Sequence, residues 1–231
     1  MEFHLLPTRT ADAAGNMAVD FLLLQRYAST DVVRYRHYEW RRPAFTFGYG
    51  QTIAFVRDRL PVGEALDVTR RATGGGLVDH RDDWTYALVI PRIHPLWDRP
   101  GPTIYHAVHE ALAEALNACG AEVALQRSEP DTAAGVCFER PEVDDVVRAR
   151  DGRKVAGAAL KRNKRGVLLQ GSVSRSLAGP VDWDAIEEHV PQAFSRALGT
   201  TLTEPGWPLF DPDEEQALVD QYASSEWIEA R

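Results

Sequence analysis

The sequence is poor in cysteine and has no long apolar run, and each shortage excludes a class of protein. Its two cysteines, Cys119 and Cys137, are too few for a disulfide framework, so we expect both to be thiols. No apolar segment approaches the roughly 18 residues that a membrane span requires. The N-terminus also lacks a basic segment followed by a long apolar stretch, which is the pattern of a secretory signal. We therefore expect a cytoplasmic protein with no membrane partner.

Positive charge is scarce as well, because 34 acidic residues outweigh 26 basic ones and give a formal net charge of -8. This balance argues against nucleic acid as a partner. One segment, L-K-R-N-K-R-G, departs from it by carrying Lys161, Arg162, Lys164 and Arg165. The segment is either a solvated hairpin tip or a docking surface for phosphate or for an acidic carrier protein.

Length and hydrophobic patterning predict one α+β domain over residues 1–231, in which a mixed sheet is flanked by about four helices. Helical spacing places two of these helices after Asn16 and Thr103, each of which is expected to be an N-cap. The segments 32–40 and 44–50 are expected to pair as strands. The remaining predicted helices cover 183–198 and 213–224, and further strands are expected at 67–72, 83–91, 122–126 and 165–174, with a hairpin at 144–160 turning at Asp151 and Gly152.

A run of three glycines stands between two of these strands, in T-R-R-A-T-G-G-G-L-V-D-H at residues 69–80. No Lys-Ser/Thr pair follows it, and no helix follows it, so it matches neither a phosphate-binding loop nor a dinucleotide fingerprint. Bare backbone lets a ligand approach the N–H groups closely, and Arg70 or Arg71 could hold a carboxylate or phosphate there. A tight bend would explain one glycine but not three.

Three further features carry possible chemistry. Lys154 stands on a predicted strand among small apolar residues, where an ammonium group needs a partner and could bind a carbonyl or phosphoryl oxygen. Cys137 lies in a polar loop, where nearby cations could lower the pKa of its thiol and make it a nucleophile. His106 and His109 are spaced for a metal, but nothing in the sequence completes a site, so no metal is assigned.

Three motifs follow one another along the chain, N-M-A-V-D at 16–20, R-R-A-T-G-G-G-L-V-D-H at 70–80 and D-G-R-K-V-A-G-A-A at 151–159. Together with Y-A-S-S-E-W at 222–227, they resemble the lipoate-protein ligase A and octanoyltransferase family. The resemblance runs over nearly the whole chain. It implies the catalytic-domain fold shared by biotin and lipoate ligases, without the additional C-terminal accessory domain that many ligases carry.

The resemblance also implies a site. In this family the arginine and the glycine loop line the tunnel that holds the acyl chain. The residues implied to contact the substrate are Arg70, Arg71, Gly74, Gly75, Gly76, His80, Gly157 and Ala158. Lys154 matches the family lysine that touches the acyl carbonyl or adenylate oxygens, and its charge would stabilise the oxyanion of acyl transfer.

Two chemistries occur on this scaffold. Ligases use ATP and Mg²⁺ to activate free lipoate, whereas octanoyltransferases take the acyl group from a carrier-protein thioester and need no cofactor. The segment G-V-C-F-E-R-P at 135–141 resembles the cysteine-dependent octanoyltransferases of the LipM kind, in which the cysteine is the nucleophile. The sequence departs from the pattern of this family at two places: no histidine stands between Gln170 and Gly171, and Ala158 replaces the usual serine.

The resemblance therefore favours an octanoyl (or lipoyl) transferase with Cys137 and Lys154 as catalytic residues. Its implied donor is octanoyl acyl carrier protein, and its implied acceptor is a lipoyl domain of the glycine cleavage H protein or of a 2-oxoacid dehydrogenase E2 subunit. Because both carriers are acidic, the 161–165 cluster is the expected dock. An ATP-dependent lipoate-protein ligase and a noncatalytic acyl- or carrier-binding subunit remain as alternatives.

Overall fold

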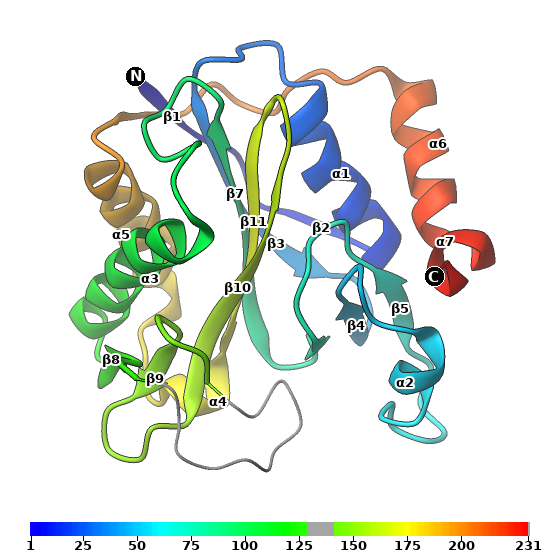
Figure 1. Cartoon of the computed structure of the whole chain (residues 1–231), viewed down its shortest axis with the longest axis horizontal. Helices are drawn as coiled ribbons and strands as arrows, with labels where there is room; N and C mark the ends of the chain where they lie inside the picture. Colours follow the sequence, from blue (N-terminus) through cyan, green and yellow to red (C-terminus); the bar gives the residue numbers. More distant parts are fainter. Residues whose placement is uncertain (129–140, 231) are drawn as a thin grey trace.

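A large mixed β-sheet forms the centre of the molecule (Figure 1). The computed structural model describes residues 1–128 and 141–230. Among these, nine strands form the large sheet, in the spatial order β12 (Thr201–Thr203), β1 (Glu2–Leu5), β3 (Val33–Trp40), β7 (Asp83–Pro91), β11 (Gly166–Ser174), β10 (Lys154–Arg162), β9 (Val146–Arg148) and β8 (Val123–Leu125), with β2 (Arg9–Ala11) paired to β3. Pairing is parallel from β12 to β3 and antiparallel from β3 to β8. The predicted mixed sheet is confirmed.

A second, three-stranded sheet consists of β5 (Asp67–Arg70), β4 (Ala44–Phe47) and β6 (Leu77–Asp79). The expectation that 32–40 pairs with 44–50 is wrong, because β3 and β4 belong to different sheets. Both edges of β3 are already occupied, by β1 and β2 on one side and by β7 on the other. The backbone groups of β4 are paired with β5 and β6 instead.

Helices cover both faces of the large sheet, with α3 (Gly101–Ala118) and α5 (Trp183–Ala197) on one face and α1 (Ala13–Gln25) and α6 (Pro212–Ala223) on the other (Figure 1). The alternation of β7 explains this arrangement, because successive side chains of a strand point to opposite faces. Trp84, Tyr86 and Leu88 pack into the core beneath α3 and α5, whereas Ala87 and Val89 pack with α1. Three short helices, α2 (Ile53–Arg57), α4 (Arg175–Ala178) and α7 (Ser225–Glu229), complete the described part.

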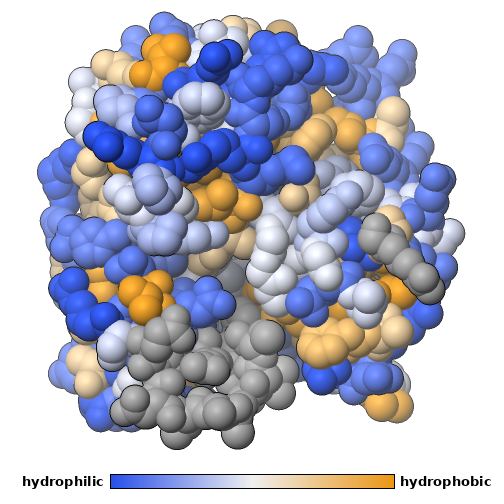
Figure 2. Space-filling model, viewed as in Figure 1, coloured by the Kyte–Doolittle hydropathy of each residue, from blue (hydrophilic) through white to orange (hydrophobic). Residues whose placement is uncertain are grey.

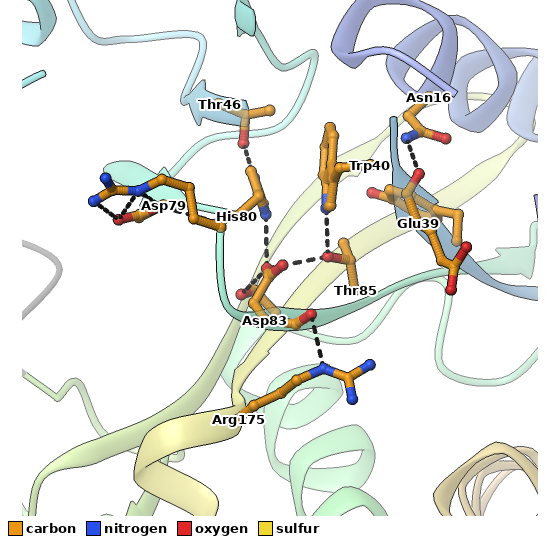
Figure 3. A network of polar contacts seen from close by, with 12 residues as sticks. Asn16, Glu39, Trp40, Thr46, Asp79, His80, Asp83, Thr85 and Arg175 are labelled. Carbon is orange, nitrogen blue, oxygen red and sulfur yellow. Dashed lines mark hydrogen bonds and ion pairs between the residues drawn. The ribbon is translucent and has the colours of Figure 1, made fainter. Parts of the chain in front are cut away.

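The two predicted N-caps are displaced toward the N-terminus. Helix α1 begins after Asp12, whose carboxylate accepts the N–H of Gly15 at 2.8 Å. Asn16 lies inside the first turn, and its side-chain amide donates to the Glu39 carbonyl at 3.0 Å (Figure 3). Helix α3 begins after Pro100, so Thr103 is also inside its helix. Because Asp12 caps α1, the side chain of Asn16 is available to bind β3.

The predicted hairpin and the glycine loop are confirmed, whereas seven helices, and not about four, occur in the described residues. The hairpin at 144–160 forms from β9 and β10 with Gly152 at φ +70°, and the three glycines lie between β5 and β6. No helix of the described residues is long and apolar enough to cross a bilayer. On the face shown in Figure 2, apolar side chains appear as separate patches among hydrophilic ones.

Candidate active site

A cavity of about 350 Å³ lies between the two sheets. Part of its wall is a row of four residues that are paired in register across the large sheet. The row runs from Gly157 on β10 through Ser172 on β11 and Thr85 on β7 to Tyr38 on β3. At about 4.8 Å between neighbouring strands, the row is roughly 14 Å long. Side-chain size increases along it, so the cavity has an open end at Gly157 and a wall at the buried Tyr38.

The glycine run contributes a second part of the wall, through Gly75 and Gly76. Two close approaches hold its backbone beside Gly48, which directly follows β4, and beside β10. An ideal Cβ on Gly48 would lie 2.1 Å from the Gly75 carbonyl oxygen and 2.5 Å from that of Gly74. Gly75 itself has φ +84°, and a Cβ there would lie 3.3 Å from Cβ of Ala159 on β10. The loop therefore lies flat against β4 on one side and close to β10 on the other.

The two consecutive arginines have different partners. Arg71 lines the cavity, and its guanidinium donates to the Gly74 carbonyl at 3.0 Å and to the Gly76 carbonyl at 2.9 Å. Burial lowers the pKa of Arg71 to about 10, which leaves it cationic at neutral pH. Arg70 points elsewhere and donates to the carbonyls of Trp227, Ile228 and Ala230. Its predicted place at the substrate is thus corrected: Arg70 is outside the cavity wall and holds the C-terminal segment.

His80 also lines the cavity, and both of its ring nitrogens are engaged with protein groups (Figure 3). Nδ1 lies 2.7 Å from Oδ2 of Asp83, and Nε2 lies 2.6 Å from Oγ1 of Thr46. The ring stacks on Trp40 with a centroid distance of 4.1 Å. Both ring nitrogens therefore contact protein groups, and His80 forms part of the cavity wall. Among the nearby acids, Asp79 pairs with Arg81 at the surface.

Lys154 enters the cavity at the Gly157 end of the row. Its Nζ lies 2.7 Å from Oδ2 of Asp145, and the side chain is 15 % exposed. Asp145 is held in turn by the N–H of Glu142, which donates to the same oxygen at 2.7 Å. An ideal Cβ on Gly157 would lie 2.6 Å from Cε of Lys154, so the bare backbone there leaves room for the end of the lysine side chain in this position. Ala158 lies beside it in the wall.

Several wall residues escaped sequence reasoning. Asp145, Glu142, Thr46, Ser172, Thr85 and Tyr38 line the cavity, and none of them is among the site residues predicted from the sequence. The signal that could have indicated Asp145 is the pair of acids just before β9. The others are fixed by register and by the packing of one sheet on the other. Gln170 acquires a clear role: its carbonyl oxygen accepts from Thr73 at 2.7 Å and its amide donates to Asp20 at 2.7 Å.

Other predicted residues lie elsewhere. Cys137 falls outside the described residues. Lys161 and Arg162 end β10 while Lys164 and Arg165 occupy the turn to β11, so the basic cluster is a hairpin tip, as one of its two interpretations proposed. The second cysteine, Cys119, is buried, and this burial raises the pKa of its thiol.

The pair His106 and His109 does not form a metal centre, and no other group of possible metal ligands occurs in the part of the chain that the structure describes. His106 Nδ1 lies 2.9 Å from Oδ1 of Asp144, and His109 Nδ1 lies 2.7 Å from the carbonyl oxygen of the same residue. Both histidines therefore join α3 to the turn that precedes β9.

Comparison with proteins of known structure agrees with this architecture. The chain superimposes on a bipartite lipoate protein ligase from Thermoplasma acidophilum with a TM-score of 0.70 and 18% identity, covering 98% of this chain and 96% of the other. A lipoate-protein ligase A bound with ATP gives a TM-score of 0.72 at 18% identity, covering 99% and 98%. At these identities the likeness establishes the fold alone.

Sequence comparison is more specific. The octanoyltransferase LipM of Moorella thermoacetica is 29% identical, with 99% of this chain and 98% of the relative covered. The protein of the same name from an Exiguobacterium species is 30% identical, with 98% and 97% covered. A model of the lipoyl protein ligase A/B catalytic domain matches residues 12–198, a span that contains the glycine loop, Lys154 and the whole cavity wall. The chain belongs to the lipoyl protein ligase A/B catalytic domain family.

Proposed function

We propose that this protein is an octanoyltransferase of protein lipoylation. It moves an octanoyl group from an acyl carrier protein through a thioester on Cys137 to a lysine of a lipoyl domain. The observation that carries the proposal is the cavity with Lys154 at its open end, in a chain whose full-length relatives are named octanoyltransferase LipM.

The dimensions of the cavity support an acyl chain of this length. An extended eight-carbon chain measures about 9 Å, given a C–C bond near 1.5 Å. From Gly157 to Thr85 the row spans two strand spacings, or about 10 Å, and Tyr38 stands one strand further on. An octanoyl group with its carbonyl beside Lys154 would therefore place its methyl end near Thr85, one strand before Tyr38.

Lys154 is placed to act on the carbonyl. Its ammonium group is mostly buried and is oriented by Asp145, so it is preorganised to donate to an oxygen that becomes negative. Residues that are tied by short hydrogen bonds to a supporting carboxylate lose little order during the reaction. Lys154 would therefore stabilise both tetrahedral intermediates.

The reaction has two steps. The Cys137 thiolate attacks the carbonyl carbon of the carrier thioester, and the carrier thiolate departs to leave an octanoyl thioester on the enzyme. The neutral amine of the acceptor lysine then attacks this thioester, the Cys137 thiolate departs, and the amine loses a proton as the amide forms. No ATP is required, because a thioester is already activated relative to an amide.

Chain length allows Cys137 to take part. Glu142, five residues further along, lines the cavity, and five residues span at most roughly 18 Å. Cys119 is a poor alternative nucleophile because burial disfavours its thiolate.

The donor and acceptor domains would dock at the hairpin tip formed by Lys161, Arg162, Lys164 and Arg165. The last three are exposed. The tip is the turn of the β10–β11 hairpin, and Lys154 begins β10 at the opposite end of that hairpin. Acidic carriers would be steered to it electrostatically. Replacing these cations should slow transfer and reduce its dependence on salt, and unchanged kinetics would contradict the docking role.

The test of the function is the intact mass of the protein after mixing with octanoyl carrier protein in the absence of ATP. The wild type and a Cys119→Ser control should gain a hydroxylamine-sensitive octanoyl group, while Cys137→Ser should gain none. Addition of an apo lipoyl domain should then move the group to that domain.

The fold likeness to lipoate protein ligases favours one second candidate, an ATP- and Mg²⁺-dependent ligase with the same acyl cavity. Lipoyl-domain modification that appears only with ATP and free acid would establish this activity and reduce Cys137 to a structural residue. Binding of the acyl group or carrier without any turnover would point to a noncatalytic subunit.

A further inference from the structure

A chain of hydrogen bonds connects the start of β7 to the glycine loop, and Figure 3 shows its part from Asp83 through His80 to Thr46. It begins at Asp83, whose Oδ2 accepts from His80 Nδ1 at 2.7 Å, from Ser172 Oγ at 2.6 Å and from Thr85 Oγ1 at 3.0 Å. The Asp83 side chain is 3 % exposed. Three donors on one oxygen of a buried carboxylate hold Asp83 in place.

The direction of each hydrogen in the chain follows from its end members. Arg71 can only donate, so Thr46 Oγ1 accepts from Arg71 Nη1 at 2.7 Å. The single hydroxyl hydrogen of Thr46 is then available to His80 Nε2, at 2.6 Å. In the arrangement in which Asp83 accepts from the ring, the ring hydrogen lies on Nδ1 and Nε2 accepts from Thr46. This arrangement gives each hydrogen bond of the chain one donor and one acceptor, while the second Asp83 oxygen, Oδ1, is buried without a hydrogen-bond partner.

The chain also joins the two sheets. Asp83 and Ser172 belong to the large sheet, whereas Thr46 is on β4 and Arg71 directly follows β5. Thr46, His80 and Arg71 are 0 %, 7 % and 5 % exposed, so these hydrogen bonds lie in a medium of low dielectric constant, which strengthens them. At its far end the Arg71 guanidinium holds the carbonyls of Gly74 and Gly76.

We propose that Asp83 is a positioning residue for the acyl site. Through His80 and Thr46 it fixes the Arg71 guanidinium, and through Arg71 it sets the distance between the glycine loop and the row that starts at Gly157. Asp83 does not line the cavity, and it acts on the acyl chain by fixing the cavity width. The kinetic consequence rests on the proposed function, but the position of the loop does not.

The most informative substitution is Asp83→Asn, which keeps the shape of the side chain. The neutral amide holds the three donors more weakly than a carboxylate does, and where its nitrogen faces His80 Nδ1 it moves the ring hydrogen to Nε2 and directs it at Thr46. The Thr46 hydroxyl would then face two donors, and its own hydrogen would have no acceptor in the chain. Asp82→Asn, which changes the exposed neighbouring carboxylate, is the matched control.

A second pair of variants tests the middle of the chain independently of Asp83. Thr46→Val removes the hydroxyl at nearly constant shape, and Thr46→Ser retains it. A role that depended on packing alone would be preserved better by valine, whereas the hydrogen-bond chain requires serine to rescue and valine to fail.

The experiment measures amide hydrogen exchange of residues 72–77 in the ligand-free protein, together with kcat and KM for octanoyl carrier protein. Asp83→Asn and Thr46→Val should raise loop exchange at least about tenfold and lower kcat/KM by roughly tenfold to a hundredfold, as expected for a displacement near 1 Å. Asp82→Asn should stay near the wild type in both readouts, and Thr46→Ser should keep loop exchange near the wild type.

Wild-type loop exchange in a folded Asp83→Asn protein would overturn the proposal, and so would a Thr46→Val variant that matches Thr46→Ser. If Asp83→Asn does not fold, the comparison of Thr46→Val with Thr46→Ser supports or overturns the proposal. Absence of transfer by the wild type would refute the proposed function, but the exchange data would still support or overturn the role of Asp83.

Discussion

Replacing Gly157 with alanine should displace Lys154 and slow acyl transfer while leaving the protein folded. The new Cβ would lie 2.6 Å from Lys154 Cε and 2.8 Å from Nζ, whereas carbon atoms in ordinary contact are about 3.5–4.0 Å apart. The end of the lysine side chain must therefore retreat by about 1 Å. Such a movement lengthens the 2.7 Å bond between Nζ and Asp145 and takes the ammonium group away from the carbonyl position.

The expected magnitude follows from this displacement. A misplacement of about 1 Å can cost a factor of roughly a hundred in rate. Stability should change little, because alanine in a strand reduces the entropy of the unfolded chain by about 0.4–1 kcal/mol, which offsets part of the clash. The lysine end is also flexible enough to move without shifting the backbone.

The assay is kcat/KM for octanoyl transfer, measured beside the melting temperature and beside Gly50→Ala as a matched control. Gly50 is exposed and has open space around its Cβ position, so its variant should match the wild type. If Gly157→Ala is folded and transfers octanoyl within about twofold of the Gly50→Ala rate, the assignment of Lys154 to the reacting carbonyl is wrong.

Three further substitutions test other parts of the site. Gly75→Ala should destabilise the protein by about 1–2 kcal/mol because of its φ of +84°, whereas Gly74→Ala, with open space, should be nearly neutral in denaturant unfolding. Arg70→Met should cost about 2 kcal/mol or more and hasten limited proteolysis of the C-terminal segment, because the carbonyls of that segment lose their donor; equal proteolysis rates would refute this. Tyr38→Leu should shift the acyl preference toward chains longer than octanoyl, which a competition between carrier thioesters would detect, while Tyr38→Phe should not.

The departures from the family pattern can be interpreted at the residue level. An ideal Cβ on Gly171 would lie 2.2 Å from Cζ of Tyr86, so this strand position admits no side chain. Gln170, just before it, is already committed to Asp20 and Thr73. Gln170 and the loop that it anchors through Thr73 thus form this part of the cavity wall.

Local structure was largely predictable from the sequence. Helical spacing located α3 and α5, and Asp151 with Gly152 marked the β9–β10 turn, because these patterns depend on neighbours within a few residues. The glycine run was likewise recognisable as a loop between strands. Helix starts were less accurate, since Asp12 and Asn16 are both good caps and the choice depends on the contact between Asn16 and β3.

The sequence by itself determined the family, the order of the elements, and the candidacy of Lys154 and the glycine loop. Only the tertiary structure decided between Arg70 and Arg71, because adjacent residues at a strand end point to opposite sides and the sequence does not say which side faces the cavity. The same holds for Asp145, Thr46 and the row that ends at Tyr38. These residues meet through strand register and sheet packing, which join positions far apart in the chain, and no local pattern encodes such contacts.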